Sequence, residues 1–111
     1  MCFGGADVVR PPDGLDQAFA AQFLEIQRAF VVGLPQRLRD IQQAPDQRAR
    51  YVALHQLTGA AGGYGFTVLS ARARGAMEAV RVDIDTGTAL ASLTDEVTRI
   101  CALAFDKGSI L

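Results

Sequence analysis

Apolar side chains in the first part of the chain recur every three or four residues. They form one stripe, made of Leu15, Phe19, Phe23, Ile26, Phe30, Leu34, Leu38 and Ile41. This spacing keeps side chains on one helix face, so it predicts a long amphipathic helix or two nearly collinear ones. Proline lacks an amide donor and its ring crowds the preceding turn. We therefore expect a kink or a restart at Gly33-Leu34-Pro35.

A second helix is indicated from Pro45 and Asp46, which are typical of helix starts, to about Ala61. The glycines that follow predict a turn; they are Gly62, Gly63 and Gly65. A third stripe follows the turn and contains Phe66, Leu69, Ala73, Ala76, Met77 and Val80. After turn-forming residues from Asp83 to Gly87, a last stripe contains Leu90, Leu93, Val97, Ile100, Cys101 and Ala104.

Sustained alternation with a period of two, the pattern of a half-buried strand, occurs nowhere in the sequence. Amphipathic helices joined by short loops are typical of an up-and-down bundle. The sequence therefore predicts an all-α, up-and-down four-helix bundle over residues 15–111. Residues 1–14 contain Gly4-Gly5 and Pro11-Pro12, and we expect them to form a mobile N-terminal extension.

Charge and composition narrow the class of protein. The chain has 111 residues, a formal net charge of −1 and an apparent pI of 5.7. This balance does not favour binding to nucleic acid, which usually requires a basic excess. No apolar run is long enough to span a bilayer, and no signal peptide is recognisable. We expect a soluble, cytoplasmic protein without a structural disulfide or metal site, because Cys2 and Cys101 lack the spacing of either.

The single histidine, His55, lies in the predicted second helix. On a helical projection, Leu54 and Leu57 mark the apolar side, and His55 falls on the opposite side with Gly59 one turn further on. Glycine in a helix interior costs roughly 1 kcal/mol relative to alanine. One explanation is that the missing side chain lets another protein approach the imidazole. Exposed histidines and glycines near helix ends also have purely structural explanations.

The stretch from His55 to Gly65, HQLTGAAGGYG, resembles the H-x-L-K-G-x-x-x-x-x-G signature of histidine-containing phosphotransfer (HPt) domains. The resemblance continues into the next helix through Leu69, Ala73 and Glu78. One position departs from the signature, because Thr58 stands where the family has lysine. That change removes a cation expected to help hold a phosphoryl group.

Two kinds of group in the sequence are candidates to replace this lysine in holding a phosphoryl group. The Thr58 hydroxyl can donate a hydrogen bond, and the charge can come from an arginine if packing brings one near. The candidates are Arg48, Arg72 and Arg74, each of which is otherwise a solvated surface charge.

The resemblance implies a phosphohistidine carrier of a two-component phosphorelay. His55 would accept a phosphoryl group on Nε2 from a receiver-domain aspartyl phosphate and pass it to another receiver. Partners would be response-regulator receiver domains or a hybrid histidine kinase, with Mg²⁺ held by the receiver and no cofactor bound by this chain. The docking face around His55 would comprise Val52, Gln56, Thr58, Gly59 and Gly62, with Tyr51 at its rim. The carrier would be a stoichiometric intermediate without an ATP-binding kinase domain, and a monomer.

Two alternatives stay open at the level of sequence. A non-catalytic docking module would bind receivers or other signalling proteins without carrying phosphate, and Thr58 in place of lysine motivates this interpretation. A metal-containing four-helix enzyme fits less well, because such sites need several inward Glu and His ligands.

Overall fold

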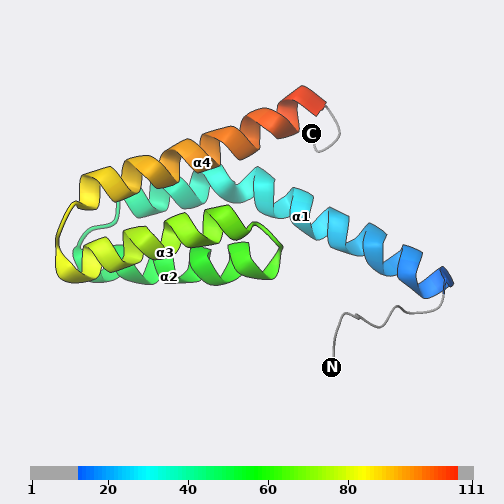
Figure 1. The fold of residues 1–111 in the computed structure, drawn as a ribbon, viewed down its shortest axis with the longest axis horizontal. Coiled ribbons are helices and arrows are strands. Elements are labelled where there is room, and N and C mark those ends of the chain that lie inside the picture. Colours follow the sequence, from blue (N-terminus) through cyan, green and yellow to red (C-terminus); the bar gives the residue numbers. More distant parts are fainter. Residues whose placement is uncertain (1–12, 108–111) are drawn as a thin grey trace.

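The structure, a computed structural model, describes the backbone of residues 13–107 and the side chains of residues 18–104. Within this range it contains four α-helices and no strand. They are α1 (Asp13–Gln42), α2 (Gln47–Gly63), α3 (Thr67–Val82) and α4 (Thr86–Lys107). Successive helices run in opposite directions, as Figure 1 shows, so the predicted all-α, up-and-down bundle is confirmed.

The order of packing around the bundle follows the order of the chain. The helix pair α2 and α3 packs most closely, α3 also packs against α4, and α1 bridges α2 and α4. Among the described residues, no Cα atom of α2 lies within 8 Å of a Cα atom of α4, so these two helices occupy diagonal positions. The largest fully buried side chains come from all four helices and are Leu34, Ile41, Leu54, Leu57, Leu69 and Leu93.

The predicted interruption at Gly33-Leu34-Pro35 takes the form of a bend rather than a restart. The helix α1 is continuous from Asp13 to Gln42 with Pro35 inside it, and Figure 1 shows its axis changing direction about half-way along. Proline in a helix interior costs about 3 kcal/mol. Pro35 itself is exposed, whereas Val31, Leu34 and Ile41 on the opposite face are buried. Packing of that face offsets the lost hydrogen bond.

The boundary of the expected N-terminal extension shifts slightly. Asp13 and Gly14 belong to α1, so the helical part begins two residues before the predicted start at residue 15. The expected mobility of the extension concerns residues 1–12, which lie outside the described residues.

Two contacts with α1 fix the ends of α2. At the N-terminus, the Asp46 carboxylate accepts a hydrogen bond from the backbone N–H of Ala49, and the Arg50 Nε donates to the Ile41 carbonyl over 2.9 Å. At the other end, the Gln27 Nε2 donates to the Tyr64 carbonyl over 2.7 Å. A side-chain cap and a donor to an otherwise unpaired helix carbonyl both satisfy terminal backbone groups. The helix that carries His55 is therefore held at both ends.

The turn between α2 and α3 requires one glycine and is packed by aromatic rings. Gly65 has a φ of +88°, a conformation that side-chain-bearing residues rarely adopt. On either side of it, Tyr64 and Phe66 place their rings 5.0 and 5.5 Å from the ring of Phe30 on α1. The α2–α3 pair is thus anchored on α1 by this aromatic cluster.

Candidate functional site

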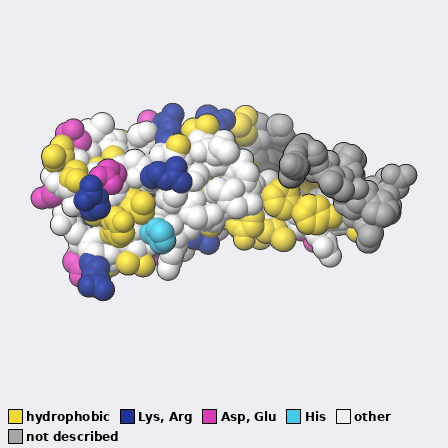
Figure 2. Space-filling view, turned by 60° about the horizontal axis from the view of Figure 1, so that its bottom comes forward, with side chains coloured by type: hydrophobic (Ala, Val, Ile, Leu, Met, Phe, Trp, Pro, Cys, Tyr) yellow, Lys and Arg dark blue, Asp and Glu magenta, His cyan; other side chains and the backbone are white. Residues whose placement is uncertain are grey.

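The inner face of α2 determines where His55 points. Leu54, Leu57 and Ala61 are fully buried and fix the rotation of the helix in the bundle. His55 follows Leu54 by one residue, which turns it by 100° away from the core. Its side chain is exposed, as predicted, and Figure 2 shows the imidazole on the molecular surface beside hydrophobic side chains.

The imidazole of His55 is free of intramolecular partners within the described part of the chain, where it forms no hydrogen bond and no ion pair. Nothing in that part of the protein therefore competes for the ring nitrogens. An exposed, unpaired imidazole is a nucleophile near neutral pH.

Gly59 lies one turn beyond His55 and is also exposed. A Cβ built at this position would meet no other atom within 4 Å, so packing inside the described protein does not require glycine here. The surface beside the imidazole is flat at this point.

Gly62 has a different environment although it lies on the same side of α2. A Cβ at Gly62 would lie 3.4 Å from the Ser70 hydroxyl of α3, which is an ordinary van der Waals contact. Gly62 therefore lies against α3, but packing between the two helices does not require glycine there.

Thr58 occupies a different place from the one predicted. It is only 8% exposed, and its hydroxyl donates to the Leu54 carbonyl over 2.8 Å. The expectation that Thr58 flanks His55 on the surface and donates to a phosphoryl group is wrong for this conformation, because the hydroxyl points into the bundle and is already engaged.

Ser70, which the sequence analysis did not single out, supports the backbone at this point. Its hydroxyl is buried and donates to the Thr58 carbonyl over 2.9 Å, which joins α3 to α2 near the histidine. The sequence contains a signal for this buried hydroxyl, because Ser70 lies four residues after Phe66 and three before Ala73 and is therefore a polar residue within an apolar stripe. Leu69 and Ala73 beside it are fully buried.

Val52 and Gln56, two residues of the predicted docking face, are both exposed. They line a shallow groove that continues across Ala53 to Asp40 of α1. The groove lies on the side of α2 that faces α1, so these two residues extend the surface around His55 away from α3.

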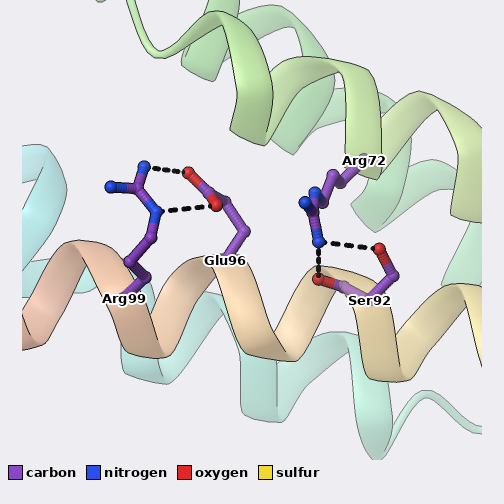
Figure 3. A network of polar contacts seen from close by, with 4 residues as sticks. All are labelled: Arg72, Ser92, Glu96 and Arg99. Atoms are coloured by element: carbon purple, nitrogen blue, oxygen red, sulfur yellow. Dashed lines mark hydrogen bonds and ion pairs between the residues drawn. The ribbon is translucent and has the colours of Figure 1, made fainter.

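Among the three candidate arginines, Arg72 points toward α4 and not toward His55. Its guanidinium donates to the Ser92 carbonyl over 3.2 Å and to the Ser92 hydroxyl over 3.0 Å, both on α4, as Figure 3 shows. It therefore faces away from α2. Arg48 and Arg74 are exposed on α2 and α3, respectively.

A second arginine on α3 is engaged by a carboxylate. Arg81 pairs with Glu78, the acidic residue of the HPt resemblance. The hydrogen bond from Arg81 lowers the pKa of the Glu78 carboxyl. Glu78 thus neutralises Arg81 at the end of α3 nearest Tyr51.

No group of three or more His, Cys, Asp or Glu side chains that could hold a metal ion occurs among the described residues. In the same part of the chain, no helix combines the length and apolar character needed to cross a membrane. Comparison with protein-family models, with curated proteins and with solved structures finds no match to this chain.

Proposed function

We propose that this chain is a phosphohistidine carrier of a two-component phosphorelay, with His55 as the phosphoacceptor. The observation that supports this most is the pairing of an exposed, unpartnered imidazole with Gly59 one turn away, where the space around the missing Cβ is empty. A helix surface that is flat beside a nucleophile suits close approach by another protein. The HxLxG spacing from His55 to Gly59 agrees with that use.

The proposed chemistry needs little from the carrier beyond a positioned nucleophile. The Nε2 lone pair of His55 attacks the phosphorus of a receiver aspartyl phosphate, in line with the bond to the carboxylate oxygen. That P–O bond breaks, the carboxylate leaves with the electron pair, and Nδ1 keeps its proton in the phosphoimidazolium. In the onward step a carboxylate of a second receiver attacks phosphorus, and the P–N bond electrons return to Nε2. Such transfers depend mainly on positioning and on charge around the phosphoryl oxygens.

Receiver domains or a hybrid histidine kinase are the proposed partners, and the Mg²⁺ that neutralises the phosphoryl oxygens belongs to the receiver. The proposed docking surface consists of Val52, Gln56, Gly59 and Gly62 around His55. We propose that the carrier is a monomer in the cytoplasm, the compartment of its receiver partners.

Phosphotransfer from charged receivers tests the proposal. Receiver domains are phosphorylated with acetyl phosphate and Mg²⁺ and mixed with wild-type protein or His55→Gln, and acid-labile phosphate on the carrier is measured. We expect label on the wild type and none on the variant. Because His55 is exposed, the substitution should leave the urea midpoint of unfolding unchanged. Equal labelling of both proteins would exclude His55 as the acceptor.

A non-catalytic docking module is the second candidate, and the environment of Thr58 favours it. With the lysine of the signature absent and the Thr58 hydroxyl bonded to Leu54, residue 58 offers no group to a phosphate. A docking module would bind a receiver with the same affinity in wild type and His55→Gln, while neither protein took up phosphate from it.

A further inference from the structure

The packing of α2 against α3 determines which residues of α3 lie level with His55. Two observed contacts set the register of this antiparallel pair. The Ser70 hydroxyl bonds to the Thr58 carbonyl over 2.9 Å, and Arg81 lines a common depression with Tyr51. Both contacts lie on the side of α2 that carries His55.

These two contacts bracket His55 on one helix and Arg74 on the other. His55 lies four residues after Tyr51 and three before Thr58. Arg74 lies four residues after Ser70 and seven before Arg81, spacings that keep it on the row of α3 facing α2. Arg74 lies about one turn after Ser70 on α3, and His55 lies about one turn before Thr58 on α2. Because the helices are antiparallel and each rises about 1.5 Å per residue, His55 and Arg74 lie at the same level along the pair.

The distance across the groove suits an arginine. Packed helices have axes about 8–10 Å apart, and here the Ser70 hydroxyl of α3 reaches the Thr58 carbonyl of α2 over 2.9 Å. Both His55 and Arg74 are exposed, on neighbouring helices. An extended arginine side chain on α3 is long enough to span this separation toward a group attached to α2.

Most other arginines are occupied elsewhere in the described structure. Arg72 bonds to Ser92, Arg81 to Glu78 and Arg99 to Glu96. Arg50 bonds to the C-terminal carbonyls of α1, Arg39 to Gln36, and Arg37 lies over the ring of Phe30. Arg28 lines a groove between α1 and α4. These seven side chains are not placed to serve His55.

Two arginines on α2 and α3 have no such contact within the described range, Arg48 and Arg74. Arg48 lies seven residues before His55 on α2, which is about 10 Å along the axis. It borders the groove that Asp46 and Asp40 also line, and it also lines the depression with Tyr51 and Arg81. Arg74 is level with His55 and is therefore better placed.

We infer that Arg74 of α3 is the phosphoryl-binding cation of this site, in place of the lysine missing at position 58 of α2. The inference rests on the proposed function, since it concerns the phosphoryl group carried by His55. The Arg74 guanidinium donates to the phosphoryl oxygens and stabilises their dianionic form, as charge-assisted hydrogen bonds do. The charge that Thr58 lacks is thus supplied across the α2–α3 groove.

The other charged and titratable groups near His55 do not fill this role. On α2 they are Tyr51 and Arg48, and on α3 they are Glu78 and Arg81, which form an ion pair. The α1 side of α2 contributes Asp40, and α4 lies diagonally across the bundle from α2. Arg74 is the cation that a phosphoryl group on Nε2 meets first.

The ionisation of the phosphoryl group tests this directly and needs no receiver. His55 is phosphorylated with phosphoramidate, and the ³¹P chemical shift is titrated around the second phosphoryl pKa, which is about 6 for protein phosphates. Because a neighbouring cation favours the dianion, Arg74→Ala should raise this pKa by roughly half a unit. Arg74→Lys should restore most of the shift. Arg72→Ala is the matched control on the opposite side of α3 and should leave the pKa unchanged.

Three results would overturn the inference. They are an unchanged phosphoryl pKa in Arg74→Ala, an equal shift in Arg72→Ala, and a wild type that phosphoramidate does not label. A shift in Arg48→Ala alone would assign the cation to α2 instead. Receiver labelling is measured separately on the same variants. A wild type that receivers do not label but whose phosphoryl pKa depends on Arg74 would refute the proposed phosphorelay role and leave the cation assignment standing.

Discussion

At Gly59, the effect of glycine on the stability of the free protein can be measured separately from its effect on binding of a partner. Glycine raises the free energy of the folded helix at this position, and no described neighbour requires it. Gly75 offers a comparison, because it is also an exposed glycine inside a helix with open space around its Cβ. Gly75 lies on the outer face of α3, away from His55.

We predict that Gly59→Ala and Gly75→Ala each stabilise the protein by about 1 kcal/mol, because alanine loses less backbone entropy in a helix. Urea unfolding measures this. Only Gly59→Ala should slow phosphotransfer from a receiver, since its added methyl group stands where the partner approaches. Equal transfer rates in both variants would show that Gly59 is not part of a docking surface.

The helical spacing of the sequence predicted that His55 is exposed, but it did not predict that Thr58 is buried. A helical projection orients side chains relative to the centre of the apolar face. Leu54 and Leu57, which are buried, located that centre accurately enough to place His55 on the exposed side. Thr58 follows Leu54 by four residues, so it lies close to the edge of the buried face. Whether such an edge residue is covered depends on the neighbouring helix, and here Ser70 of α3 covers it. That contact joins residues 12 apart and cannot be derived from the local pattern.

At the scale of single helices, apolar periodicity predicted the elements well because each helix buries one continuous stripe. All four were located within a few residues of their observed ends. The effect of Pro35 was harder to judge, since a sequence shows the lost hydrogen bond but not the packing that offsets it. The opposite face of α1 is buried on both sides of Pro35, and the helix therefore continues.

The helix α4 contains a charged residue on its buried side. Glu96 is 4% exposed, and its carboxylate accepts a hydrogen bond from the Arg99 Nε over 3.0 Å (Figure 3). This hydrogen bond is the main reason that the pKa of the Glu96 carboxyl is lowered, and burial opposes it. An ionised Glu96 thus stabilises the folded state.

The pH dependence of stability follows from this lowered pKa. The contribution of Glu96 is fully present above the ordinary carboxyl pKa of 4.5 and is lost as the pH falls through the lower folded-state value. We predict that Glu96→Gln reduces the free energy of unfolding by about 1–2 kcal/mol at pH 7, and that the difference from wild type shrinks below about pH 4. Urea melts at several pH values measure it.

Glu78→Gln is the matched control for Glu96→Gln. Glu78 pairs with Arg81 at the same three-residue spacing, but both side chains are more than half exposed. Solvent screens such a pair, so its removal should change stability far less. If the two substitutions had equal effects at pH 7, burial of Glu96 would not be the reason for its contribution.

At the scale of the whole molecule, the helices differ in length and the bundle is uneven along its long axis. The first turns of α1 extend beyond the other three helices, as Figure 1 shows. Phe19 is 62% exposed there, whereas the buried residues of α1 begin at Phe30. Few tertiary contacts thus hold the start of α1.

Hydrogen exchange should reflect this unevenness. Amides of α1 before Phe30 are expected to exchange on the order of 100-fold faster than those of the buried part of α1 and of α2, because local opening there breaks few apolar contacts. Mass spectrometry of peptides from the two parts of α1 measures the difference. Uniform protection along α1 would mean that another surface covers its first turns.

The diagonal placement of α2 and α4 separates the chemistry of the molecule from part of its stability. In the described part of the chain, no Cα atom of α2 lies within 8 Å of a Cα atom of α4, so a shift of the α4 backbone reaches α2 mainly through α1 and α3. Substitutions on α4 can therefore raise or lower the melting temperature while the acceptor geometry stays constant. Substitutions on α4 can, for this reason, separate the stability of the bundle from the proposed transfer activity of His55.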